Sequence, residues 1–384
     1  MIKQYNYIII GAGCAGLSLL MRMLDNNADA KVLLLDKTGK NTNDRTWCFW
    51  EKKAGYFDDI VYRKWNDLSF CDESGYKHLA MEEYSYKMIR GIDFYSYCFN
   101  RIQQSPGVEF QITDIQSAEV TGNRCRIKAG SDTIEAEAEF VFNSIPGKAT
   151  PDIRAIALLQ HFKGWIIRTE GNSNNIKPCL MDFRIDQSPG IAFVYTLPVD
   201  ETSVLIEYTV FSSTVLPGEK YDNALKGYIE NTLGIKTYTL EHTEFGIIPM
   251  TNQRFPFYKN GMYYIGSAGG QTKPSSGYTF SFIQKQSECI ARQLSTCVPS
   301  LRKCNTNKAR FLLYDSILLK ILHDDIMPGS EIFKRLFHRL PACIIFKFLD
   351  NETTLSEEIK ILNAMPSKIF LPVAIKQMIN QLRN

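Results

Sequence analysis

The sequence lacks any apolar stretch long enough to cross a membrane. A transmembrane helix needs about 18 or more consecutive apolar residues, and no segment of this 384-residue chain reaches that length. The apolar start of the chain, "YIIIGAGCAGLSLL", is broken by glycines and precedes a strand that ends in an acid, so we do not expect it to be a secretory signal. A substrate held in a membrane would have to be taken up by a protein lying on its surface.

The chain also lacks the cysteine and histidine spacings of metal-binding proteins. It has ten cysteines and five histidines, but no CxxC pair and no cysteine at zinc-ligand spacing from a histidine. We therefore expect no metal site. Because no secretory signal is evident, we expect the cysteines to be reduced thiols in a cytoplasmic protein.

A strong excess of charge of either sign is missing as well. The 44 basic and 41 acidic residues give a net charge of +3, which does not predict a nucleic-acid partner. Hydrophobic residues make up 45% of the chain and charged residues 22%, as in ordinary globular proteins. A chain of this length can bury the cores of two domains or of one elaborated domain.

What the chain does have is a glycine fingerprint at its N-terminus. "YNYIIIGAGCAGLSLLMRML" predicts a buried strand, a tight turn and a helix, with Gly11, Gly13 and Gly16 in GxGxxG spacing. Gly11 would allow the turn, Gly13 the approach of a pyrophosphate, and Gly16 the close packing of helix and strand. A second strand, "KVLLLDK", ends in Asp36, which stands where an acid would bind a ribose. Together these elements predict a dinucleotide-binding fold.

A second glycine-rich segment, residues 261–286, suggests that the dinucleotide is FAD. It combines a short strand, a glycine cluster, Pro274 and a helix, and its backbone N–H groups would point at a flavin or a phosphate near Pro274. The alternative is a purely structural loop between a strand and a helix. The glycines assigned to the cofactor are Gly266, Gly269, Gly270 and Gly277.

The pattern along the chain predicts an α/β fold in which a Rossmann-type FAD-binding domain carries an inserted antiparallel sheet. Alternating stretches between about 108 and 143 predict a small antiparallel sheet, and further strands follow from about 151 to 250. From about 298 onward the pattern becomes helical. We assign residues 1–70, 91–150 and 255–297 to the FAD-binding domain, 71–90 and 151–254 to a substrate-binding domain, and 298–384 to a helical region.

One carboxylate stands out in the antiparallel region. Glu207 interrupts "SVLIEYTVF", a run of strand-forming residues, and strand alternation places it on one face with Leu205, Thr209 and Phe211. A carboxyl group in such an apolar setting tends to keep its proton. The alternatives are a residue on an edge strand that faces solvent, or one that is paired with an arginine.

The helical region contains a basic amphipathic helix at residues 331–341. Ile332, Phe333 and Leu336 share one face, and Lys334 and Arg335 lie on the other. Such a helix can lie on an anionic membrane, or it can pack on its own core with a solvated basic face. The sequence leaves both possibilities open.

Several motifs resemble the FAD-dependent lycopene cyclases of bacteria and plants, with an aromatic-hydroxylase-like flavoprotein fold. The most specific are "NDRTWCFW" (43–50), "CLMDFR" (179–184) and the acid in "LIEYT" (205–209). The resemblance extends over nearly the whole chain. It also includes "LLQHFKGWIIRT" (158–169), "EFGIIPM" (244–250), "GSAGGQTKPSSGYTF" (266–280), "FKRLFHRLP" (333–341) and "FLDNETTLSEEIKIL" (348–362).

The resemblance implies a lycopene beta-cyclase that uses reduced FAD without net redox change. Electrons would come from NAD(P)H or a partner reductase, and lycopene would come from the membrane, with the protein peripheral on its inner face. An acid protonates a terminal double bond, an internal alkene closes the ring, and loss of another proton gives γ- and then β-carotene. Glu207 matches the family's catalytic acid, and Asp182 could assist it.

A carbocation formed in this way needs electron-rich neighbours that do not capture it, and aromatic faces meet that need. Each aromatic candidate can also be an ordinary packed side chain. Arg45 can pair with a cofactor phosphate or with Asp44. The predicted lining residues are Trp47, Phe49, Trp50, Trp165, Tyr195 and Glu244.

The chain departs from the related patterns at three places. Tyr208 stands where the plant form has a second acid, and Asn143 with Ser144 replaces the Asp-Gly pair of aromatic hydroxylases. "GSAGG" replaces the usual Gly-Asp-Ala motif, so no acid would bind the ribitol there. Two alternative functions remain at this point: a flavin-dependent isoprenoid reductase or monooxygenase, and a flavoprotein that binds lipid or carotenoid without chemistry.

Overall fold

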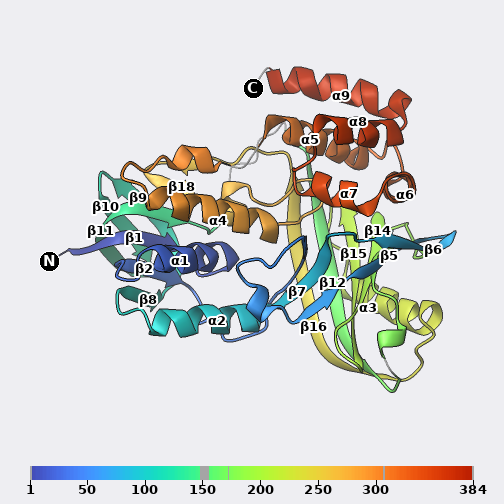
Figure 1. The fold of residues 1–384 in the computed structure, drawn as a ribbon, viewed down its shortest axis with the longest axis horizontal. Helices are drawn as coiled ribbons and strands as arrows, with labels where there is room; N and C mark the ends of the chain where they lie inside the picture. Colours follow the sequence, from blue (N-terminus) through green and yellow to red (C-terminus); the bar gives the residue numbers. More distant parts are fainter. Residues whose placement is uncertain (1, 148–154, 172, 306–307, 383–384) are drawn as a thin grey trace.

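The computed structural model describes residues 2–147, 155–171, 173–305 and 308–382. Two large sheets lie in separate halves of the molecule, and a small third sheet lies near their junction (Figure 1). The C-terminal helices cover one end of the second sheet (Figure 1).

The first sheet has the parallel core expected of a nucleotide-binding domain. Its central strand is β1, whose residues Ile8, Ile9 and Ile10 are almost completely buried, and α1 (Cys14–Asn26) is the next element after β1. In spatial order the strands are β17 (Tyr258–Lys259), β18 (Met262–Tyr264), β11 (Asp132–Asn143), β1 (Lys3–Ile10), β2 (Val32–Asp36) and β8 (Val108–Ile112), with β10 (Arg124–Ala129) and β9 (Ile115–Thr121) extending from β11.

The second sheet is mainly antiparallel and has seven strands. One face packs against α3 (Gly218–Gly227), and the other forms the largest apolar cluster together with the C-terminal helices. The strand order is β16 (Tyr238–Thr251), β12 (Ala157–Thr169), β15 (Ser203–Ser212), β14 (Ile191–Pro198), β13 (Cys179–Asp182), β5 (Asp67–Asp72) and β6 (Gly75–Ala80).

The third sheet and the helices complete the fold. The small sheet has the order β3 (Thr46–Glu51), β7 (Ser85–Arg90) and β4 (Arg63–Trp65). The α-helices are α1 (Cys14–Asn26), α2 (Gly91–Gln103), α3 (Gly218–Gly227), α4 (Phe280–Leu294), α5 (Ala309–His323), α6 (Gly329–Arg339), α7 (Ala342–Leu349), α8 (Leu355–Ala364) and α9 (Ser367–Leu382). Among the helices of the described residues, none has the length and apolar character to span a bilayer.

Some predicted elements differ in detail. The strands β9, β10 and β11 form the expected antiparallel sheet, but β8 pairs in parallel with β2. Helix α4 begins at Phe280, later than expected, because Gly277 has a φ of +71° and a helix cannot continue through that left-handed conformation. Residues 148–154, which include the predicted boundary between residues 150 and 151, lie outside the described residues, and the three-part division of the chain stays a prediction.

The cysteines also differ from expectation. Cys289 of α4 and Cys304 form a disulfide across 15 residues, so the prediction that all ten cysteines are reduced is wrong for this pair. The spacing resembles no motif that would have indicated the bond from sequence. Cys71 and Cys179, on neighbouring strands, are free and buried, with their sulfur atoms 3.1 Å apart.

Candidate functional site

The N-terminal glycine turn has the geometry that its sequence predicts. Gly11 has a φ of +99°, and an added Cβ there would lie 2.2 Å from Ser144 Oγ. An added Cβ at Gly16 would lie 1.9 Å from the backbone oxygen of Gly11, so α1 can pack this closely on the turn only with glycine at that position. Both constraints arise within the protein, without any ligand.

Gly13 differs from these two glycines, because no described part of the protein fills the space beside it. It is the N-cap of α1, a Cβ there would meet no atom within 4 Å, and no side chain in the described ranges caps the helix. The first N–H groups of α1 thus face a space that suits a phosphate. Asp36 ends β2 beside this space, accepts a 2.8 Å hydrogen bond from the Ala12 N–H and pairs with Lys40 at 3.1 Å.

The second glycine segment packs against the first. A short 3₁₀ turn, Gly266–Gly269, follows β18, and an added Cβ at Gly266 would lie 2.6 Å from Ala15 Cβ of α1. At Gly269 it would lie 2.1 Å from Tyr264 O, and Gly270 is left-handed with a φ of +74°. The structure therefore brings together the two glycine segments that we assigned to FAD.

The loop that follows, residues 271–279, is fixed by a buried ion pair. Lys273 Nζ lies 2.9 Å from Asp315 Oδ1 of α5, and both side chains are at most 2% exposed. Ser275 Oγ donates to the same carboxylate at 2.6 Å, and Lys273 also donates to Asn351 Oδ1 at 2.8 Å. This loop thus joins the half of the molecule that contains the first sheet to the C-terminal helices.

Glu207 lies in a row of four residues on one face of the second sheet. Glu207 pairs with Gly164 on one side and with Tyr195 on the other, and Gly164 pairs in turn with Glu244. Residues directly opposite one another in adjacent strands point to the same face. The two carboxylates therefore face the same space, separated only by a glycine.

The surroundings of Glu207 favour its protonated form. Burial and the nearby carboxylate of Glu244 raise the pKa of Glu207 to about 8, although Thr209 Oγ1 donates to Glu207 Oε1 at 3.0 Å. Leu205 and Phe211 flank it in the large apolar cluster, as alternation predicts. Because β15 lies between β12 and β14, the alternative of an edge-strand residue is wrong.

Glu244 has surroundings that differ from those of Glu207. Its pKa is raised by burial, while the Thr46 N–H, which donates to its Oε1 at 3.1 Å, and the charge of Arg45 act in the opposite direction. Arg45 is exposed, and Asp44 accepts a 3.0 Å hydrogen bond from the Tyr95 hydroxyl. Arg45, which directly precedes β3, therefore has its charge near Glu244.

The predicted aromatic residues divide into two groups. Trp50 and Tyr195 both approach Tyr278 on the Glu207 side of the sheet. The Trp50 and Tyr278 rings lie 4.5 Å apart, and the hydroxyls of Tyr195 and Tyr278 lie 3.4 Å apart. Asp350 accepts a 3.0 Å hydrogen bond from Trp50 Nε1, and burial raises the pKa of Asp350 to about 6.

The other predicted aromatics lie elsewhere. Trp47 and Phe49 point to the opposite side of β3, where both contact Phe280 in the core of the half that contains the first sheet. Trp165 packs on the far face of the second sheet, the face that α3 covers. Alternation along β3 and β12 explains these placements, because Cys48 and Gly164 occupy the positions that face Glu207.

Asp182 belongs to a separate cluster. It is fully buried, pairs with Arg184 at 2.7 Å and accepts a 2.7 Å hydrogen bond from Tyr228. Tyr228 belongs to the apolar cluster on the α3 face, so the structure does not bring Asp182 and Glu207 together. The Asp182 carboxylate lies near the sulfur atoms of Cys71 and Cys179.

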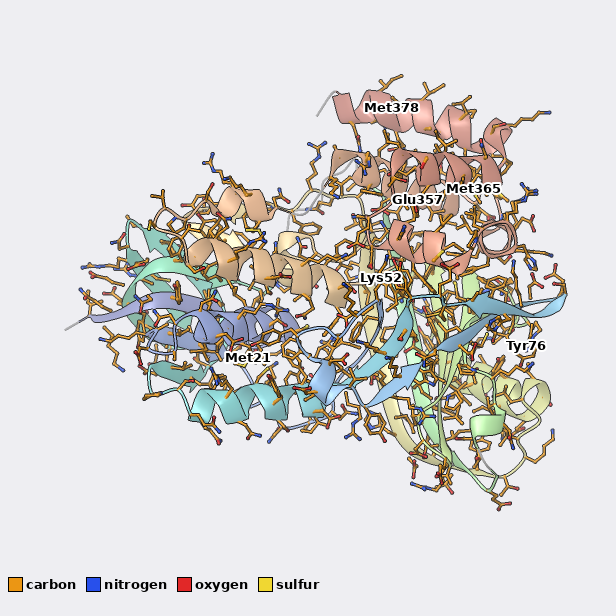
Figure 2. The ribbon with its side chains drawn as sticks, in the orientation of Figure 1. Met21, Lys52, Tyr76, Glu357, Met365 and Met378 are labelled. Atoms are coloured by element: carbon orange, nitrogen blue, oxygen red, sulfur yellow. A yellow bond between two sulfur atoms is a disulfide. The ribbon has the colours of Figure 1, made fainter. Side chains whose placement is uncertain are left out.

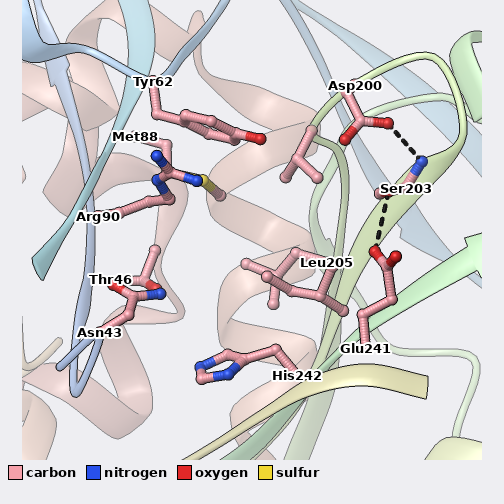
Figure 3. Close-up of a pocket in the computed structure, with 12 residues that line it drawn as sticks. Asn43, Thr46, Tyr62, Met88, Arg90, Asp200, Ser203, Leu205, Glu241 and His242 are labelled. Carbon is pink, nitrogen blue, oxygen red and sulfur yellow. Dashed lines mark hydrogen bonds between the residues drawn. The ribbon is translucent and has the colours of Figure 1, made fainter. Parts of the chain in front are cut away.

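A cavity of about 260 Å³ lies beside the carboxylate row (Figure 3). Leu205 and His242, which line it, stand two residues before Glu207 and Glu244 on their strands. On the opposite wall lie Thr46 and Arg90 of the small sheet (Figure 3). The cavity therefore lies next to the row on its strands, although neither carboxylate lines it.

Three residues of this site were missed by the sequence analysis. Gly164 was detectable, because a glycine inside a strand often marks a close approach to the backbone. Tyr278 lies within the quoted glycine segment, but nothing in the sequence places it opposite Tyr195. Burial, and after it the nearby charges of Glu207 and Glu244, raise the pKa of the Cys48 thiol well above its ordinary value.

Comparison with solved structures defines the class of protein. A geranylgeranyl bacteriochlorophyll reductase-like protein from Thermoplasma acidophilum aligns with a TM-score of 0.65 at 13% identity, covering 98% of this chain and 99% of that one. A flavoprotein/dehydrogenase from Cytophaga hutchinsonii aligns with a TM-score of 0.65 at 11% identity, covering 99% of this chain and 100% of that one. A probable FAD-dependent monooxygenase from Pseudomonas aeruginosa aligns with a TM-score of 0.59 at 11% identity, covering 84% of this chain and 97% of that one. The fold is that of FAD-dependent flavoproteins, as predicted.

Sequence comparison identifies the family. Residues 6–374 match the family described as lycopene cyclase protein. The lycopene beta-cyclase of Pantoea ananas is 23% identical over 381 residues, covering 95% of this chain and 96% of that protein. The lycopene beta-cyclase of Pseudescherichia vulneris is 24% identical over 301 residues, covering 74% and 72%. The chain belongs to the lycopene cyclase family, which confirms the predicted resemblance.

Proposed function

We propose that this protein is a lycopene beta-cyclase in which Glu207 is the catalytic acid. The observation that carries the proposal is the position of Glu207: an interior strand places its carboxyl on an apolar face, with a pKa raised to about 8. At neutral pH this group keeps a proton that an ordinary glutamate has lost. A proton donor in apolar surroundings is what protonation of an alkene requires.

The residues support a binding site for FAD. The uncapped start of α1 beside Gly13 suits the pyrophosphate, and the packed segment Gly266–Gly270 suits the approach of the cofactor to the backbone. Bound in its reduced form, FAD would supply negative charge near the reacting carbons. We propose NAD(P)H or a partner reductase as the source of its electrons.

The chemistry on this face is an isomerisation. Glu207 donates its proton to a carbon of the terminal double bond, the internal alkene supplies the electron pair for the new ring bond, and a different proton leaves to restore a double bond. The Glu207 carboxylate formed in the first step lies beside the new positive charge. Tyr195, Tyr278 and Trp50 offer aromatic rings on the same side of the sheet.

We further propose that the protein acts at the inner face of a membrane that holds lycopene. The test of function is expression in a bacterium that accumulates lycopene, followed by chromatography of the pigments. Formation of β-carotene or monocyclic γ-carotene supports the proposal. Unchanged lycopene contradicts it, and an acyclic product that has gained two hydrogens relative to lycopene would instead favour a flavin-dependent reductase.

A further inference from the structure

The last two helices expose an apolar surface that the rest of the described chain leaves uncovered. Both α8 and α9 carry apolar side chains at helical spacing, so each helix presents one apolar face. These side chains are between 45% and 67% exposed. They are Leu355, Ile359 and Leu362 of α8 and Leu371, Ile375, Met378 and Ile379 of α9, and we call them the α8–α9 surface.

This surface lies at the edge of the molecule. Helix α9 forms the outermost layer of the C-terminal half, at the top of Figure 1, and Figure 2 shows Met378 on that outer helix. Helices α8 and α9 are consecutive and are separated only by residues 365 and 366. Soluble monomers rarely expose large apolar patches without a partner, so seven such side chains on two neighbouring helices indicate a docking site.

Charge on the two helices favours one kind of partner. Lys360, Lys368 and Lys376 are exposed, and in the described part of the chain no carboxylate pairs with them. The two acids of α8 are already neutralised, since Glu357 pairs with Lys347 and Glu358 with Arg310. No acidic residue occurs after Glu358 in the sequence. Exposed apolar side chains flanked by unpaired lysines are the pattern of a helix that lies in an anionic membrane surface.

The basic helix singled out in the sequence is not this surface. In α6, Ile332 and Phe337 are buried in the large apolar cluster. Its basic residues are paired: Lys334 with Glu73, and His338 with Asp72 at 2.8 Å. Helix α6 therefore matches the alternative of a helix packed on its own core.

Beneath the α8–α9 surface, buried residues of this helix pair belong to the same apolar cluster as the candidate site. Met365, directly after α8, and Val373 of α9 are buried in the same apolar cluster as Leu205 and Phe211, the neighbours of Glu207. If α8 and α9 bind lipid, they therefore pack directly on the apolar cluster that an apolar substrate has to reach.

We propose that the α8–α9 surface docks on an anionic lipid membrane, with its apolar side chains in the interface and Lys360, Lys368 and Lys376 at the headgroups. The proposal rests on the proposed function only for the identity of the substrate. Membrane binding itself is independent of catalysis and can be measured without lycopene.

The experiment is flotation of the purified full-length, FAD-loaded protein with vesicles of phosphatidylcholine alone or mixed with phosphatidylglycerol. Wild-type protein should float with the mixed vesicles. Leu371→Asp with Ile375→Asp should lower the bound fraction roughly tenfold or more, because two charges would enter the interface. The matched control is Ile112→Asp, an equally exposed isoleucine on β8 of the other half, which should float as the wild type does.

A second variant tests the charge without touching the apolar face. Lys368→Gln with Lys376→Gln should weaken binding to the mixed vesicles by about tenfold or more, since each lysine near an anionic surface contributes about fivefold. Binding to phosphatidylcholine alone should not change. Unfolding midpoints and FAD content equal to those of wild type establish that each variant is folded.

Two results would overturn the proposal. One is equal flotation of wild type and Leu371→Asp/Ile375→Asp. The other is light scattering that shows a wild-type dimer which the same variant converts to monomer, with no vesicle binding by either protein; the surface would then join two copies of the chain. Cyclisation of detergent-dispersed lycopene, measured in parallel, separates a failure of docking from a failure of the proposed function.

Discussion

The proton on Glu207 is explained by its neighbours in the sheet. Burial on an apolar face is the main reason that its pKa rises, and the second is the carboxylate of Glu244 across Gly164. Like charges in one space disfavour simultaneous ionisation, so one of the two groups holds a proton. Glu244 accepts a hydrogen bond from the Thr46 N–H and feels the charge of Arg45, which makes it the better anion.

This explanation predicts how stability depends on pH. The pKa of Glu207 is about 8 in the folded protein against an ordinary value of 4.5, so its contribution to stability is complete below 4.5 and is lost as pH rises through 8. Glu207→Gln cannot ionise and should lose none of this stability. Thermal unfolding at pH 6 and pH 9 should show a smaller drop in Tm for the variant than for wild type. An equal drop would mean that Glu207 ionises freely in the fold.

Glu244→Gln should act on the proton of Glu207. Removing the neighbouring negative charge lowers the pKa of Glu207, so the alkaline limb of the pH–rate profile should move to lower pH. The pKa of Glu207 should still lie well above its ordinary value in this variant, because burial is the larger cause of its rise. A turnover profile recorded between pH 6 and pH 10 measures it. An unchanged alkaline limb with normal FAD content would show that the two carboxylates are not coupled.

Gly164 should matter for the space between the carboxylates. An added Cβ there would lie 3.4 Å from Leu205 Cδ1 and 3.7 Å from Glu207 Cβ, an ordinary contact, so alanine fits and a larger side chain fills the gap. Gly164→Val should keep the fold, because valine favours strands, and should lower turnover by roughly tenfold or more, with Gly164→Ala milder. Circular dichroism and FAD content check the fold. Full activity of the valine variant would show that the space at Gly164 is not needed for turnover.

At the scale of elements, the loop 271–279 is the joint between the two halves. Its position depends on Lys273, which reaches Asp315 of α5 and Asn351 after α7. The segment that contains Asn351 resembles the family in sequence, and its neighbour Asp350 contacts Trp50. Contacts of this kind link a cofactor loop to the helices that cover the substrate face.

Breaking the buried ion pair should therefore be costly. Asp315→Asn leaves the Lys273 ammonium buried without its counter-charge and should lower the free energy of unfolding by about 3–5 kcal/mol. Lys273→Met combined with Asp315→Leu removes both charges and should recover much of that loss. Urea unfolding of the three proteins provides the measurement. If Asp315→Asn is as stable as wild type, the ion pair between Lys273 and Asp315 does not stabilise the loop.

Elements with a strong local signal could be predicted from the sequence, and those decided by distant partners could not. The strand, turn and helix around Gly11 to Gly16 follow from local patterning, as does the strand that carries Glu207. The parallel pairing of β8 with β2 depends on a strand far away in the sequence. Likewise, Trp165 lies opposite to the expected side because its neighbour Gly164 takes the position that faces Glu207. Alternation defines two faces, but tertiary packing decides which face meets the substrate.

At the scale of the whole molecule, the fold places a nucleotide-binding sheet beside an antiparallel sheet that carries the acid. The C-terminal helices cover the same apolar cluster and expose the α8–α9 surface. The predicted fold class and family are confirmed. The role of each site residue stays a prediction, because sequence can nominate an acid such as Glu207 but cannot show which groups share its space.

The most direct measurement is cyclisation of lycopene in D₂O by the purified protein loaded with reduced FAD. If Glu207 delivers a solvent-exchangeable proton without net redox change, each ring in the product should carry a single deuterium, with no stoichiometric consumption of NAD(P)H. Glu207→Gln should bind FAD as wild type does and form product about 10²–10⁴-fold more slowly. Product without deuterium, or a fully active Glu207→Gln, would contradict the account.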